Sequence, residues 1–219
     1  MRNHSVASRL QAAALAWLAG YVDAVGFISL GGYFVSFMSG NSTRWGVDLA
    51  GQIRHAWIAI ALIATFVAGV ALGTAVAMSR GTPAFRRVLV LVCAVLAAAS
   101  ALATFGHAQL AAFAAALGMG AVNVAFLRGG ELPVGLTYMT GTLVRIGREL
   151  GSLPFGGSLR SCVPYLLHWL ALVAGAAVGA VGYAWVGATA LWLACVVALA
   201  LACVGDRPAA RQHAHVEVG

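Results

Sequence analysis

The sequence is dominated by long apolar runs, each close to the length of about 20 residues that a helix needs to cross a bilayer. The six runs are residues 10–31, 57–79, 87–106, 109–127, 163–186 and 188–204. The segments between them are mostly short loops. This pattern predicts an all-α membrane protein with six transmembrane helices.

Composition supports this class of protein. The chain is 62% hydrophobic and 9% charged, and its mean hydropathy is +0.92. Soluble domains are typically only about half apolar. We therefore expect the lipid bilayer, rather than water, to surround most of the chain.

The basic residues predict the orientation of the spans. All thirteen are Arg, and the formal net charge is +7, which in a soluble protein would suggest a nucleic-acid partner. Eleven of them fall in segments on the side of the N-terminus, against only Arg44 and Arg54 on the other side. The positive-inside rule then places both termini in the cytoplasm, and we expect no nucleic-acid partner.

The sequence contains an internal repeat. "MSGNSTRWGVDLA" (38–50) and "MTGTLVRIGRELG" (139–151) share Met, Gly, Arg, Gly and Leu, "VAGVALG" (67–73) matches "VAGAAVG" (173–179), and "GYVDA" (20–24) matches "GAVNV" (120–124). Each half therefore has three spans, and a short broken or re-entrant motif helix follows the first of them. We divide the chain into a first three-span repeat (1–107), a second repeat (108–205) and a polar cytoplasmic tail (206–219).

Because each half has an odd number of spans, the second repeat is expected to be inverted relative to the first. Many secondary transporters share this plan, with the substrate site near the midplane between the halves. The repeated glycines Gly69, Gly73, Gly175 and Gly179 are spaced four apart, as in closely packed membrane helices. Such faces allow a homo-oligomer but do not require one.

Asp23 is an acidic residue within the first span, where a carboxylate costs about 3 kcal/mol. It is either a proton, cation or substrate-orienting group, or a structural anchor that accepts hydrogen bonds. Arg44 lies four residues before Asp48, and Arg145 four before Glu149, so each Arg forms either a local ion pair or, with its helix start, an anion site. The candidate substrate-binding residues are Tyr21, Asp23, Ser39, Gly40, Asn41, Arg44, Asn123, Tyr138, Thr140, Gly141, Thr142 and Arg145.

Patterns typical of enzymes and metal sites are poorly met. Metalloprotease, hydrolase and nucleotide-binding motifs are absent from the sequence, and it has only six acidic residues. The four cysteines are scattered without a C-x-x-C pair, and His213 and His215 in the tail have no third ligand nearby. We expect no enzymatic activity, no metal and no cofactor.

Two segments resemble a known family. "AGYVDAVGFISLGGYFVSFMSGNSTRWG" resembles the opening signature of the YoaK-type bacterial membrane proteins, and "NVAFLRGG" followed by "TYMTGTLVRIG" resembles their second signature. The resemblance covers nearly the whole chain and implies a six-span inner-membrane protein without implying an activity. Where the family usually has Gln before the Asn, this chain has Val122.

The function that we expect is a transporter or channel for a small solute, with the site at the repeat interface. The two Arg and the two helix starts favour an anionic or carboxylated solute. The alternative is a non-transporting membrane assembly or sensor protein whose motifs are structural helix staples.

Overall fold

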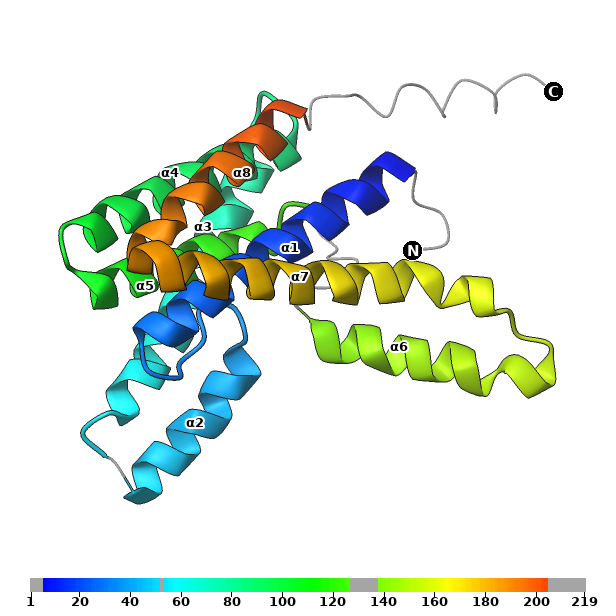
Figure 1. The fold of residues 1–219 in the computed structure, drawn as a ribbon. Helices are drawn as coiled ribbons and strands as arrows, with labels where there is room; N and C mark the ends of the chain where they lie inside the picture. The colour runs from blue at the N-terminus through cyan, green and yellow to red at the C-terminus, as the bar shows by residue number, and fades with distance from the viewer. Residues whose placement is uncertain (1–5, 52, 127–137, 205–219) are drawn as a thin grey trace.

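The computed structural model describes residues 6–51, 53–126 and 138–204, and within these ranges the regular elements are helices (Figure 1). The predicted tail, with His213 and His215, lies outside the described residues. The α-helices are α1 (Val6–Ser29), α2 (Met38–Gly51), α3 (Ala56–Met78), α4 (Ala84–Thr104), α5 (Ala108–Val122), α6 (Met139–Gly151), α7 (Val163–Val186) and α8 (Leu191–Val204). Short 3-10 turns are η1 (Leu153–Phe155), η2 (Leu159–Ser161) and η3 (Gly187–Ala190).

Each apolar run overlaps most of one helix; the helices are, in chain order, α1, α3, α4, α5, α7 and α8. Four helical stretches are long and apolar enough to cross a membrane: Arg9–Ser29, Ala56–Met78, Ala84–Thr104 and Leu159–Val204. The last stretch includes both α7 and α8, and α5 has only 15 residues. At 1.5 Å per residue α5 is about 22 Å long, less than the hydrocarbon thickness of about 30 Å. The all-helical prediction is confirmed, and six crossings remain a prediction.

The small residues of α5 place it in the core. Nine of its fifteen residues are buried, and seven of these nine are Ala or Gly. α5 packs against α3, α4 and, less extensively, α1. Small side chains allow neighbouring helices to approach closely, which is how membrane helices gain packing energy without a hydrophobic driving force.

Glycines set the crossing of α1 and α7. A Cβ at Gly20 on α1 would overlap the carbonyl of Leu172 on α7, and one at Gly175 on α7 would overlap the carbonyl of Trp17 on α1. Each helix therefore needs the glycine of the other. Substitution of either would push the backbones apart.

The crossing of α3 and α5 repeats this arrangement. A Cβ at Gly120 on α5 would overlap the carbonyl of Phe66 on α3, and one at Gly69 on α3 would overlap that of Leu117 on α5. The residues on α5 lie 100 positions after their counterparts on α1. The residues on α3 lie 106 positions before their counterparts on α7. The first helix of each half thus packs against the second long helix of the other half.

A third glycine pair extends the correspondence. Gly179 on α7 lies against the backbone of Tyr21, and Gly73 on α3 lies against that of Ala121. The four glycines for which the sequence predicted helix packing therefore contact α1 and α5. These contacts join residues far apart in the sequence into two helix pairs with the same packing.

The two motif helices lie apart. α2 packs against α3, and α6 packs against α7, so each motif helix contacts the next long helix of its own half. Figure 1 shows α2 beside the beginning of α3 and α6 alongside α7, at separate places in the molecule.

Candidate functional site

Asp23 anchors the loop that leads from α1 into α2. Its Oδ1 accepts hydrogen bonds from the backbone N–H groups of Val35 (2.8 Å) and Ser36 (2.9 Å). Both donors lie in the loop just ahead of α2, which begins at Met38. The carboxyl group of Asp23 thus ties the end of α1 to the loop before α2.

Asn41 holds the same loop from within α2. Its Oδ1 accepts a hydrogen bond from the backbone N–H of Phe34 (2.9 Å), and its Nδ2 donates to the carbonyl of Phe34 (2.6 Å). The side chain of Asn41 is fully buried. Two bonds between one amide side chain and one peptide backbone fix the direction in which the loop enters the helix.

The first turn of α2 has little room around Gly40. A Cβ there would overlap the ring of Phe37 and lie close to the ring of Phe34. Ser39 is exposed, and its carbonyl accepts a hydrogen bond from Thr43 Oγ1 at 3.2 Å. Gly40 therefore leaves room for aromatic packing, while Ser39 lies on the exposed surface of α2.

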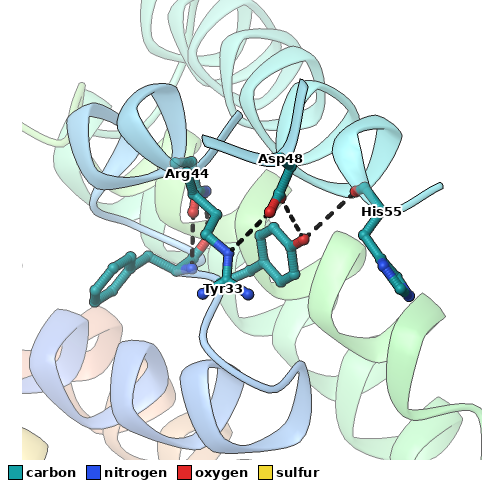
Figure 2. Close-up of polar contacts among 6 residues, drawn as sticks. Tyr33, Arg44, Asp48 and His55 are labelled. Carbon is teal, nitrogen blue, oxygen red and sulfur yellow. Dashed lines mark hydrogen bonds and ion pairs between the residues drawn. The ribbon is translucent and has the colours of Figure 1, made fainter. Parts of the chain in front are cut away.

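Arg44, Asp48 and Tyr33 form a compact polar cluster (Figure 2). Arg44 Nε lies 3.4 Å from Asp48 Oδ1, so the ion pair predicted from their spacing is present. Tyr33 donates its hydroxyl hydrogen to Asp48 Oδ2 at 2.6 Å, and its ring centroid lies 4.8 Å from the Arg44 guanidinium carbon. Asp48 is 2% exposed and Arg44 is 38% exposed, so the carboxylate is buried under a partly exposed cation.

Tyr33 also ties this cluster to the start of α3. Its hydroxyl lies 3.5 Å from the carbonyl oxygen of His55, the residue that precedes α3. Burial, followed by the hydrogen bond to Asp48, raises the pKa of Tyr33 above its ordinary value. The neutral phenol is therefore the form that the fold favours.

The second motif uses its Arg differently. Arg145 Nη1 lies 3.4 Å from the hydroxyl of Tyr165 on α7, and the guanidinium carbon lies 5.6 Å from the centroid of that ring. Thr142, which matches Asn41 in the repeat, is buried. In both motifs the Arg contacts a tyrosine ring, but the two tyrosines come from different elements.

The other predicted residues of the second motif do not gather around Arg145. Tyr138 and Thr140 are exposed, and Gly141 leaves room for the ring of Tyr138. Asn123, which matches Asp23, is buried directly after α5, and its Nδ2 donates to the carbonyl of Met119 in the last turn of that helix at 2.8 Å.

Tyr21 belongs to a separate contact. Its hydroxyl donates to the carbonyl of Ala190 in η3 at 2.8 Å, and its ring stacks on Trp17 with centroids 5.4 Å apart. Tyr21 thus joins α1 to the turn before α8. Of the predicted residues, Asp23, Asn41 and Arg44 therefore lie around the α1–α2 loop, whereas Arg145 contacts α7 and Tyr21 contacts η3.

Two tyrosines that contact the motif arginines were not among the predicted site residues. Tyr33 lies in the loop before α2, within the segment that resembles the family signature, but no local spacing indicates its contacts with Arg44 and Asp48. Tyr165 has the position of an interfacial aromatic residue, and only the structure shows that it contacts Arg145. Within the described residues, no group of three or more His, Cys, Asp or Glu side chains is arranged to hold a metal ion.

Comparisons with known proteins agree with a membrane protein. A family model described as "protein of unknown function (DUF1275)" matches residues 11–204. A UPF0700 transmembrane protein of Rhizobium meliloti (strain 1021) is 38% identical over 190 residues, which cover 86% of this chain and 82% of the relative. No solved structure matches the chain. The likeness to YoaK-type proteins rests on the quoted segments alone.

Proposed function

The chain belongs to the DUF1275 family of proteins of unknown function, and we propose that it is a transporter or channel that moves a small solute between two inverted halves. The observation that carries this proposal is the recurrence of the same glycine crossings, α1 with α7 and α5 with α3, at the offsets of the sequence repeat. Inverted repeats whose helices meet at an interface near the membrane midplane are the plan of many secondary transporters.

The proposal includes six crossings of a bacterial inner membrane with both termini in the cytoplasm. Gly187, whose φ is +63°, lets the chain turn between α7 and α8, so that each crosses separately. The distribution of Arg supports the orientation. Single cysteines at the exposed positions Thr82 and His107, in a background without native cysteines, should react with a membrane-impermeant thiol reagent from opposite sides. Reaction from the same side would contradict the topology.

The solute that fits best is a small anion or carboxylate near α6 and α7. Arg44 is paired with the carboxylate of Asp48, whereas Arg145 contacts the neutral phenol of Tyr165. The positive charge of Arg145 is therefore less compensated by its contacts. Polar contacts for the solute would come from Arg145, from Tyr165 beside it, and from Thr142 three residues earlier on α6. We assign no enzymatic activity.

The experiment that tests this function uses the purified full chain. Carboxylated metabolites are screened for those that raise its melting temperature, because a bound ligand stabilises the folded state. Uptake of the hits is then measured in proteoliposomes for the wild type, Arg145→Ala and Arg145→Lys. We expect loss of uptake in R145A and partial retention in R145K. Unchanged uptake in R145A would remove Arg145 from the site.

A specific observation favours a second candidate function, in which the motifs only hold helices together and the protein transports nothing. The side chains of Asp23 and Asn41 both form hydrogen bonds with the backbone of the loop between α1 and α2. If no metabolite binds and no solute is taken up by folded protein, the motifs serve to hold helices together in an assembly or sensor protein.

A further inference from the structure

The third helices of the two halves meet at a pair of thiols. Cys93 on α4 and Cys195 on α8 have sulfur atoms 3.7 Å apart. The contact is reciprocal, because Cys93 Sγ lies 3.8 Å from the carbonyl oxygen of Cys195, and Cys195 Sγ lies 3.6 Å from that of Cys93. Both cysteines are partly buried and reduced.

The surrounding surface explains why the sulfurs meet. α8 buries Ala194, Ala198 and Ala202, which are spaced four apart and allow a close approach to another helix. α8 packs against α4, and Trp192 Nε1 adds a hydrogen bond to Thr104 Oγ1 at 3.2 Å. The thiols are thus held at a helix contact that joins the two halves.

The other two cysteines provide a contrast within the same chain. Cys162 is buried at the beginning of α7, and Cys203 is exposed near the end of α8. Among the described residues, the sulfur-to-sulfur contact is that of Cys93 with Cys195. A disulfide needs a sulfur separation of about 2.05 Å, so these two sulfurs must approach by about 1.6 Å.

We propose that Cys93 and Cys195 are a modification site, at which a lipid hydroperoxide converts the two thiols into a reversible disulfide. One sulfur attacks the terminal oxygen of the hydroperoxide, which leaves a sulfenic acid and releases the lipid alcohol. The second sulfur then attacks the sulfenic sulfur and releases water. Together the two thiols lose two protons and two electrons, and the hydroperoxide is reduced to the alcohol and water.

Lipid hydroperoxides suit the location because they dissolve in the bilayer that would surround α4 and α8. The disulfide would tie the third helix of one half to that of the other. If the halves must move against each other during transport, the tie stops transport; this last step rests on the proposed function.

The test uses the full-length protein in phosphatidylcholine vesicles that contain linoleic acid hydroperoxide. We expect the free thiols to fall from four to two per chain, the intact mass to fall by two hydrogen atoms, and dithiothreitol to restore both. Cys93→Ser and Cys195→Ser should prevent the mass change. Cys162→Ser and Cys203→Ser are the matched controls and should still show it.

Four free thiols in the treated wild type, or a disulfide that involves Cys162 or Cys203, would overturn the proposal. Because thiols are counted without any solute, this result is independent of transport. Uptake is compared separately in the reduced and oxidised protein. Equal uptake in the two forms would overturn the inference that the disulfide stops transport. Absence of uptake in both forms would count against the proposed function alone.

Discussion

The two motif helices come from matching stretches of sequence but are held in different ways. α2 is anchored through the loop before it, by Asp23 from α1 and by Asn41 from its own first turns. For α6, the anchor that the structure shows comes from the helix after it, where Tyr165 meets Arg145. The repeat therefore preserves the helix and its Arg, while the residues that fix the helix in place differ.

One contact is nevertheless common to both motif helices. Each Arg lies over a tyrosine ring, although Tyr33 precedes its motif and Tyr165 follows its own. Cation–π contacts of this kind are worth about 0.5–2 kcal/mol, depending on solvent exposure. The Arg–Tyr contact is thus common to both halves, and the buried carboxylate of Asp48 is the addition that distinguishes the first.

Removal of the Asp23 anchor is expected to have the largest effect. Asp23→Ala leaves two backbone N–H groups, those of Val35 and Ser36, without their acceptor. At about 1–3 kcal/mol for each unsatisfied buried group, we expect a loss of about 3 kcal/mol in the free energy of unfolding, measured in mixed micelles. Asp23→Asn keeps an acceptor and should lose less. Wild-type stability in D23A would show that the loop is held by other contacts.

The next largest effect is expected at Asn41. Asn41→Ala removes both bonds to the backbone of Phe34 and should cost about 2 kcal/mol. Thr142→Ala makes the corresponding change in α6, where the side chain is smaller, and should cost about 0.5 kcal/mol. The same unfolding measurement compares them. Equal losses would mean that the two motif helices are anchored alike.

A smaller effect is expected from the tyrosine hydroxyls. Tyr33→Phe keeps the ring under Arg44 but removes the 2.6 Å hydrogen bond to Asp48, at a cost of about 1.5 kcal/mol for a bond to a charged group. Tyr165→Phe removes only a 3.4 Å contact to Arg145 and should cost less than about 0.5 kcal/mol. A larger loss in Y165F than in Y33F would reverse the order inferred from the distances.

The sequence was sufficient for those features that depend on local spacing. Hydropathy located the long helices, the four-residue spacing predicted the pair of Arg44 with Asp48, and spacing identified the packing glycines. Spacing does not identify the partner that a polar residue meets when that partner lies far away in the sequence. No pattern indicates that Asp23 reaches the backbone twelve residues later, or that Tyr165 reaches α6, because such contacts depend on how helices pack.

The smallest effect expected is the pH dependence that the Tyr33 hydroxyl contributes to the stability of the fold. Burial and the hydrogen bond to Asp48 raise the pKa of Tyr33, so the unfolded chain loses this proton at a lower pH than the folded one. The resulting stabilisation is fully present below pH 10, the ordinary pKa of the phenol, and is lost as the pH rises through the folded pKa. The Y33F variant lacks this proton. The contributions of the other titratable groups to the pH dependence of stability are common to both proteins and cancel in the comparison. Thermal unfolding measured between neutral pH and pH 11 should therefore show the stability advantage of the wild type over Y33F shrinking above pH 10. An advantage that stays constant or grows over that range would mean that the bond to Asp48 does not favour the neutral phenol.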